Sequence, residues 1–242
     1  MEYTFYGCNS LIYLDLNDFC AINLKNMAYT FHSCSSLESL DLSNFLTSEI
    51  VNMNSTFFGC QNLQSLDLRS FTTLKLKYMS KTFYGCSSLK SLDLSNFKTV
   101  SLQNMFSIFT NCSSLTSLII NNFDTSQVPN MDYVFYGCSS LKSLNLINFD
   151  TSSATSFIGM FSKCYNMQYL YIDTFNTSKI NNMESMFSDC NSLLSLNLTN
   201  FDTSLTRNID KMFDGCNIKL TYCIDDKKQY AFSSLLMEFT KD

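Results

Sequence analysis

Residues 79–104 read MSKTFYGCSSLKSLDLSNFKTVSLQN, and this stretch decides the fold because its pattern returns along the whole chain. Residues 131–156 read MDYVFYGCSSLKSLNLINFDTSSATS, with Met, Phe, Cys, Leu and a second Phe at the same places. Nine cysteines from Cys8 to Cys216 follow one another at intervals of 26 residues, without insertion or deletion. Periods of about 20–50 residues are typical of stacked supersecondary units. The sequence therefore predicts a solenoid of nine coils.

Within one unit, the spacing predicts one strand and one short helix. Leu92 and Leu94 alternate as in a strand that buries one face. Met79, Phe83 and Cys86 lie at i, i+4 and i+7, which places them on one face of a helix. Stacking the units buries these side chains in a continuous core. We therefore expect an α/β solenoid with one parallel sheet and short helices on the opposite side.

Turns must form with few of the usual turn residues, because the chain of 242 residues has only six Gly and one Pro. A Thr recurs in each coil from Thr47 to Thr203, close to Asn. Side chains of Asn and Thr can hydrogen-bond nearby backbone. We expect them to form the turns in place of Gly and Pro.

The two ends of the repeat region differ. The pattern breaks after Cys216, so residues 1–216 form the repeat solenoid and residues 217–242 a C-terminal unit. Leu220, Tyr222 and Ile224 predict a last, slipped strand, followed by a helix that caps the core. Met1 already occupies the repeat's own Met position, so we expect further repeats or a partner chain at the N-terminal end.

Composition excludes some classes of function. The formal net charge of -5, with 16 Lys+Arg, argues against nucleic-acid binding, which needs a basic face. No run of about 18 apolar residues is present, so no membrane-spanning segment is predicted.

The two quoted units resemble the 26-residue repeat of bacterial surface proteins, the BspA-like branch of the leucine-rich repeats, and the resemblance covers residues 1–216. It implies a leucine-rich-repeat-like solenoid at the cell surface or outside the cell, acting in adhesion and in contact with a host or matrix. Many cysteines and the lack of a signal segment favour the alternative, a cytoplasmic scaffold or structural subunit of a larger assembly.

The cysteine ladder allows disulfides, a metal array or buried thiols. Equivalent side chains in a stack point the same way, and a metal site needs CxxC pairs or added His, so buried structural thiols are favoured and no metal or cofactor is expected. Cys20 and Cys223 lie off the ladder and are the candidates for reactive thiols. The one His, His32, stands in a variable column that carries aromatic residues, so the sequence predicts no enzyme.

An acidic column lies on the outward face of the predicted strands. Its members hold the same position in four adjacent coils: Asp15, Asp41, Asp67 and Asp93. Like charges at that spacing repel unless a cation or a basic ligand relieves them. The alternative is a row of solvated carboxylates balanced by nearby lysines.

In later coils the outward positions carry apolar and aromatic residues instead: Ile119, Ile147, Tyr169, Tyr171 and Leu194. These side chains should point away from the core, and exposed Tyr and Ile on a sheet face are typical of an interface. The alternative is scattered surface hydrophobes, which are common. The hypothesis is a binding module whose strand face takes a protein or glycan ligand, with the acidic column adding selectivity.

Overall fold

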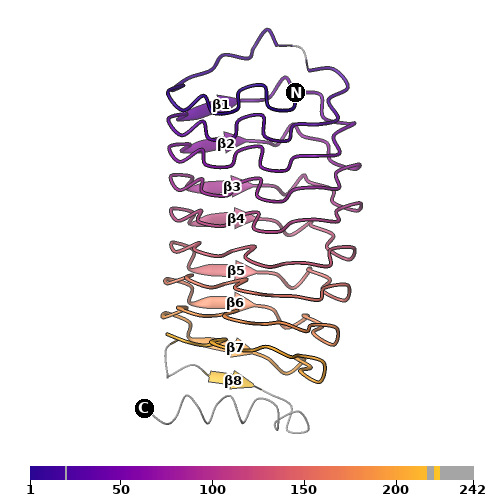
Figure 1. The fold of residues 1–242 in the computed structure, drawn as a ribbon, viewed down its shortest axis with the longest axis vertical. Coiled ribbons are helices and arrows are strands. Elements are labelled where there is room, and N and C mark those ends of the chain that lie inside the picture. Colours follow the sequence, from indigo (N-terminus) through magenta and orange to yellow (C-terminus); the bar gives the residue numbers. More distant parts are fainter. Residues whose placement is uncertain (20, 217–220, 224–242) are drawn as a thin grey trace.

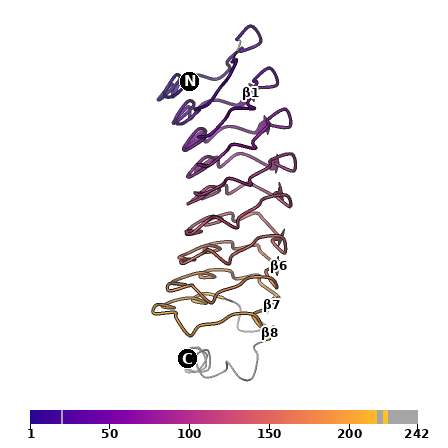
Figure 2. The ribbon, with the colours of Figure 1, turned by 90° about the vertical axis from the view of Figure 1, so that its right-hand side faces the viewer.

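The computed structural model describes residues 1–19, 21–216 and 221–223, with backbone only for the last three. Figures 1 and 2 show coils stacked along one axis, with the strands in one column on one side of the stack. Each strand has three residues. The strands are β1 (Ser39–Asp41), β2 (Ser65–Asp67), β3 (Ser91–Asp93), β4 (Ser117–Ile119), β5 (Ser143–Asn145), β6 (Tyr169–Tyr171), β7 (Ser195–Asn197) and β8 (Thr221–Cys223).

Strand pairing is parallel and keeps the 26-residue period. Leu40 of β1 pairs with Leu66 of β2, and Leu144 of β5 pairs with Leu170 of β6. The expected single sheet is divided into three hydrogen-bonded groups, β1-β2, β3-β4 and β5-β6-β7-β8. Because each strand is so short, the loss of a few ladder bonds is enough to interrupt the pairing.

The alternation expected for the strands is confirmed. The central Leu92 of β3 is buried, as is Leu94 just beyond the strand, while Ser91 points outward. The strand column therefore has one face in the core and one in solvent.

The short helix expected at Met79–Cys86 is wrong: none of the described residues is helical, and this segment is a chain of turns. Amides of Met79 and Phe83 donate to carbonyls of the next coil, at 2.8 and 2.9 Å, and the intervening Thr82 amide donates to the Met79 carbonyl at 3.1 Å. Lys81 and Gly85 have φ of 55° and 71°, in the left-handed region. An α-helix needs each amide to bond within its own segment and each φ to be negative, so stacking of the coils excludes it. The described residues therefore form strands and turns, in place of the strands and helices of the expected α/β class.

The core is built from ladders of identical side chains. Phe57, Phe83 and Phe109 stack with ring centroids 5.7 and 5.6 Å apart. The second Phe ladder stacks at wider spacing, 6.4 Å between Phe71 and Phe97. Every ring in these two stretches is buried, so stacked aromatic rings fill the centre of the solenoid.

The Thr column also acts between coils. The Thr99 hydroxyl donates to the Asp124 carbonyl at 3.1 Å and accepts from the Asp124 amide at 2.7 Å. Thr73 makes the same pair of bonds to Lys98. The Thr side chains therefore do hydrogen-bond backbone, as the sequence indicates, but they bond the backbone of the next coil.

Most ladder cysteines are buried thiols with a hydrogen-bonding role. The Cys86 Sγ donates to the Phe57 carbonyl at 3.2 Å, and Cys112 donates to Phe83 at 3.1 Å. Burial raises the pKa of the Cys112 thiol to about 12, which suppresses the reactive thiolate. The prediction of buried structural thiols is confirmed for the seven ladder cysteines from Cys34 to Cys190; all members of the ladder are free, but Cys8 is exposed and Cys216 is half-buried. Cys20 and the side chain of Cys223 lie outside the described residues.

The C-terminal strand β8 is not slipped. Leu196 of β7 pairs with Tyr222 of β8, at the same offset as the other strands. The backbone ladder of the solenoid sets this register, because the preceding coil offers its hydrogen-bonding groups at a fixed spacing. The expected capping helix lies outside the described residues.

Candidate functional site: the outward strand face

Each acidic residue of the predicted stripe closes a turn, and Asp41, Asp67 and Asp93 do so at the end of a strand. The Oδ1 atom of Asp41 accepts a hydrogen bond from the Ser43 amide at 2.9 Å, and Asp93 accepts from Ser95 at 2.9 Å. Asp15 accepts from the amide two residues on at the same distance. This contact is an Asx turn, in which the side chain satisfies a backbone amide.

The turn explains a polar residue in this column but not its charge. Asn145 and Asn197 hold the same position in later coils and accept from the amides of Ile147 and Thr199, at 3.1 and 3.0 Å. The use of Asp in some coils and Asn in others at this position is the signal from which the turn could have been predicted. A neutral Asn is sufficient for the turn, so the four consecutive negative charges need another explanation.

Arg69 is the cation of the stripe. Its Nη2 lies 2.7 Å from Oδ2 of Asp67 and its Nε lies 3.0 Å from Oδ1, which makes the ion pair bidentate. The Arg69 guanidinium holds the pKa of Asp67 at about 2. Sequence analysis missed this residue, although it stands two positions after Asp67 in the turn.

The neighbouring carboxylates are also stabilised in their charged form. The Ser43 backbone amide lowers the pKa of Asp41, and hydrogen bonds from the side chain and backbone of Ser95 lower the pKa of Asp93. Both carboxylates are therefore ionised at neutral pH.

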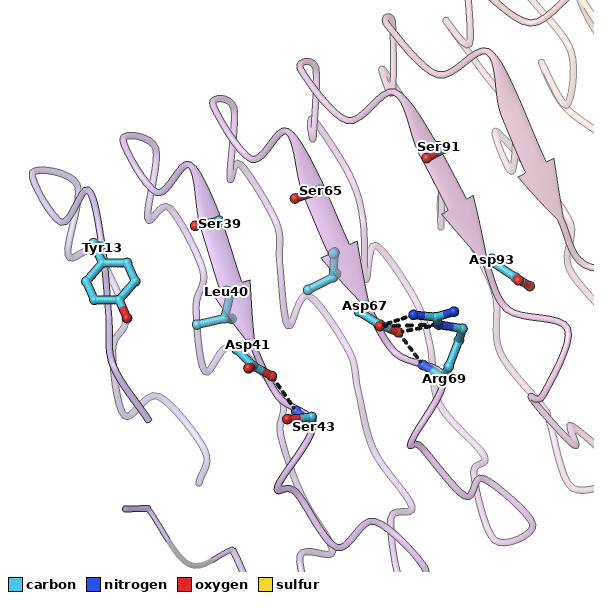
Figure 3. A pocket seen from close by; sticks show the side chains of 11 residues that line it. Tyr13, Ser39, Leu40, Asp41, Ser43, Ser65, Asp67, Arg69, Ser91 and Asp93 are labelled. Carbon is cyan, nitrogen blue, oxygen red and sulfur yellow. Dashed lines mark hydrogen bonds and ion pairs between the residues drawn. The ribbon is translucent and has the colours of Figure 1, made fainter. Parts of the chain in front are cut away.

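The acidic column borders an open hollow of about 530 Å³ on the strand face (Figure 3). Tyr13 stands at its N-terminal end, and the outward hydroxyls of three strand serines form a second row beside the carboxylates. The serines are Ser39, Ser65 and Ser91. Hydroxyl groups, carboxylates and one guanidinium therefore share this hollow with the apolar side chains of Leu40 and Leu66.

Five residues of the later coils form what we call the apolar patch: Ile119, Ile147, Tyr169, Tyr171 and Leu194. All five are exposed, as predicted; Tyr169 and Tyr171 are each 45% exposed on β6. Ile119 ends β4 and pairs in register with Asp93, so the patch begins directly beside the acidic column.

Ile119 and Tyr171 replace the turn-closing Asp or Asn of their column. In the coil between them, the short Asn145 side chain accepts the Ile147 amide. Ile119 has no acceptor atom, and the Tyr171 hydroxyl stands at the far end of its ring, beyond reach of that amide position. These two coils therefore lack a local stabilising contact and place an apolar group in solvent instead.

The turn segments carry a stack of aromatic rings that the sequence analysis did not predict. Tyr6, His32, Phe58 and Tyr84 stack with successive centroid distances of 4.7, 4.4 and 4.6 Å. The stack could have been predicted from the sequence, because these four residues hold the same position in successive repeats. His32 Nδ1 lies 2.9 Å from the Ser33 hydroxyl, and partial burial lowers the pKa of the imidazole. His32 is thus a half-buried member of a stack.

The described part of the chain holds no group of three or more His, Cys, Asp or Glu placed to bind a metal ion. Over the same residues, no helix has the length and apolar character needed to cross a bilayer.

The sequence profile of a family described as "Mycoplasma protein of unknown function, DUF285" matches residues 1–119 and 109–222. This match confirms the resemblance to repeats of bacterial proteins. A search of the curated proteins gives no match.

Among solved structures, the chain is similar to a leucine-rich repeat protein of T. pallidum, with 19% identity, 69% of each chain covered and a TM-score of 0.47. It is also similar to a leucine-rich cell surface protein of Faecalibacterium prausnitzii A2-165, with 14% identity, 84% of this chain and 78% of that chain covered, and a TM-score of 0.31. A leucine-rich repeat protein of Leptospira interrogans has 20% identity, with 81% and 52% covered and a TM-score of 0.29. These overlaps are partial, and the fold rests on the strand register and the bonds between coils.

Proposed function

We propose that this chain, which belongs to the DUF285 family, is a non-enzymatic binding module that recognises a protein or glycan ligand through its strand face, in adhesion at a cell surface. The apolar patch would supply contact area and the acidic column would supply selectivity.

The observation that carries this proposal is the exposure of Ile119 and Tyr171 at positions where neighbouring coils use a turn-closing Asp or Asn. The core does not need them, because the inward position of each strand already holds a Leu, which is partly buried in β4 and buried in β6. An outward aromatic that also gives up a hydrogen bond is unfavourable in solvent, and burial against a ligand offsets that cost.

The binding test uses an array of matrix proteins and glycans probed with the full chain. Replacing Tyr169 and Tyr171 by Ala should abolish whatever binding the wild-type chain has. The matched control is Tyr165→Ala, since Tyr165 is similarly exposed, at 41%, but lies off the strands. Binding that survives the double replacement, or that is lost equally in the control, contradicts the proposal.

Location is tested separately, by labelling intact producing cells with a membrane-impermeant amine reagent and detecting the chain by mass spectrometry. Labelling supports a surface location. An unlabelled chain that is present in the lysate contradicts it.

A second candidate function is a scaffold or structural subunit inside the cell. It is favoured by the ladder of buried thiols, because reducing compartments keep thiols unoxidised. A count of free thiols under denaturing conditions separates the two: eleven free thiols are expected for the scaffold, and several paired cysteines count against it.

A further inference from the structure

The strand face is divided into two chemically different parts that touch. Its acidic column runs through Asp41, Asp67 and Asp93, and the next residue in the column is Ile119, which pairs with Asp93. Tyr171 lies two coils further on in the same column. One ligand that follows this column therefore meets carboxylates first and apolar side chains afterwards.

Arg69 demonstrates how a cation sits on this face. Its guanidinium binds both oxygens of Asp67 although both side chains are largely exposed, at 72% and 57%. Asp41 and Asp93 belong to no ion pair within the described residues. Both are fixed by the same Asx turn as Asp67, so little side-chain freedom remains to be lost on binding.

We propose that the strand face binds a polypeptide segment with arginine side chains at one end and apolar side chains at the other. The segment lies across the strands, along the axis of the solenoid. This inference rests on the proposed function and narrows its ligand: an anionic glycan is repelled by the carboxylates, and a neutral glycan leaves their charge unmatched. Arginine fits because its planar group binds a carboxylate through two parallel hydrogen bonds.

Length also sets a requirement. Hydrogen-bonded strands lie about 4.8 Å apart, and two of the five steps from Asp41 to Tyr171 cross between separate strand groups, so the span is at least about 24 Å. An extended segment of about seven residues or slightly more covers that distance. The basic and apolar ends can therefore belong to one short stretch of chain.

The test uses three labelled synthetic peptides of twelve residues, titrated with the full chain and followed by fluorescence anisotropy. The first alternates Arg with Ser in its first half and Leu with Tyr in its second half. Its two twins carry Glu or Gln in place of every Arg. We expect only the Arg peptide to bind, with an affinity that falls as salt is raised.

Two strand-face variants copy residues that the chain already uses. Asp41→Asn with Asp93→Asn keeps the turn hydrogen bonds, as Asn145 and Asn197 do, and removes two charges. Tyr169→Ser with Tyr171→Asn restores the Ser and Asn of neighbouring coils. We expect the first pair to weaken binding of the Arg peptide about tenfold, and the second pair to weaken it by at least that factor.

The matched control removes the same charge elsewhere. Asp124 and Asp150 accept the amides of Ser126 and Ser152 in a turn off the strands, and Asn176 makes that contact in the next coil. Asp124→Asn with Asp150→Asn should therefore leave both the fold and the affinity unchanged.

Failure of this inference and failure of the proposed function give different results. Equal weakening in the control pair means that only net charge attracts the peptide, which overturns the inference, as does no binding of the Arg peptide. If a Glu or Gln twin binds as tightly and the Tyr variants abolish it, the strand face binds without selecting arginine, and only the inference falls. Peptide binding that is insensitive to both strand-face variants overturns the inference and the proposed function together.

Discussion

The solenoid has an N-terminal half (residues 27–104) and a C-terminal half (residues 105–208). The two halves have the same backbone but differ in the buried side chains at one position of the repeat. In the first half, the position three after Met holds a buried Thr: Thr56 donates to the carbonyls of Met53 and Met27, at 2.7 and 3.0 Å. In the second half, the same position holds Ile108, Val134, Met160 or Met186, all buried. The ladder of amides between coils therefore does not depend on the hydroxyls.

The outward columns change at the same place. Carboxylates up to Asp93 give way to Ile119 and Tyr171, while the buried Leu, Phe and Cys continue through both halves. The comparison teaches that the backbone ladder and the apolar columns hold the fold, which leaves the remaining columns free to carry different chemistry in each half.

The largest expected effect comes from breaking what the halves share. Phe83→Ala and Phe135→Ala each remove a fully buried ring from the same stack, and each should lower the free energy of unfolding by about 3–5 kcal/mol. Urea unfolding followed by circular dichroism measures both. A difference of several kcal/mol between the two variants contradicts the idea of one common core.

A smaller loss of stability should distinguish the buried Thr of the first half from the buried apolar residues of the second half. Thr56→Val removes one hydroxyl donor from the Met27 and Met53 carbonyls, which keep the hydroxyls of Thr30 and Thr82, and should cost about 0.5–1.5 kcal/mol. Val134→Thr should cost less, because the new hydroxyl can reach the Met131 carbonyl as Thr56 reaches Met53. Thermal unfolding measures the stability lost in each variant. A larger loss in Val134→Thr than in Thr56→Val would show that the halves differ in backbone as well as in buried side chains.

Between pH 7 and pH 5, acid sensitivity should arise in the N-terminal half, which holds the one histidine. Burial lowers the pKa of His32, whose ring stacks between Tyr6 and Phe58 and lies beside the ring of Tyr29. The folded state therefore binds a proton at His32 less readily than the unfolded state, whose His pKa is about 6.5. The free energy of unfolding is at its full value above pH 6.5, and it decreases as the pH falls through the lowered pKa of the folded state.

His32→Phe should remove that loss, so its urea midpoint should change less than that of the wild type between pH 7 and pH 5. The Asp pKa values are lowered too, but their stabilisation is lost only below about pH 4, outside this window. Identical pH profiles of wild type and variant contradict the prediction.

The smallest effect concerns a single missing bond near the boundary between the halves. The amides of Gln103 and Thr155 each donate to the preceding coil, to Lys77 and Pro129, both at distances below 3 Å. Pro129 holds the same position and has no amide hydrogen. In Pro129→Thr, we expect the new amide to donate to the Gln103 carbonyl and to exchange with deuterium as slowly as the amides of Gln103 and Thr155. Fast exchange at position 129 means that the ladder is open there for another reason.

Much of this protein was determined by its sequence alone. A fixed period of 26 residues places identical residues beside one another, so the buried ladders of Phe83 and Cys86, the strand at Leu92 and the exposure of Tyr171 all follow from the pattern. In a solenoid, near neighbours in space are a constant distance apart in sequence, which makes packing readable from spacing.

Only the tertiary structure decided where the backbone bonds go. The spacing of Met79, Phe83 and Cys86 suits a helix, but their amides and those between them are divided between the next coil and the same segment. Likewise, the pairing of Arg69 with Asp67 and the turn closed by Asp93 depend on the direction that the chain takes after each strand. A hydrogen bond needs a partner at a particular distance and angle, and stacking of the coils supplies that partner, whereas burial needs only an apolar side chain facing inward.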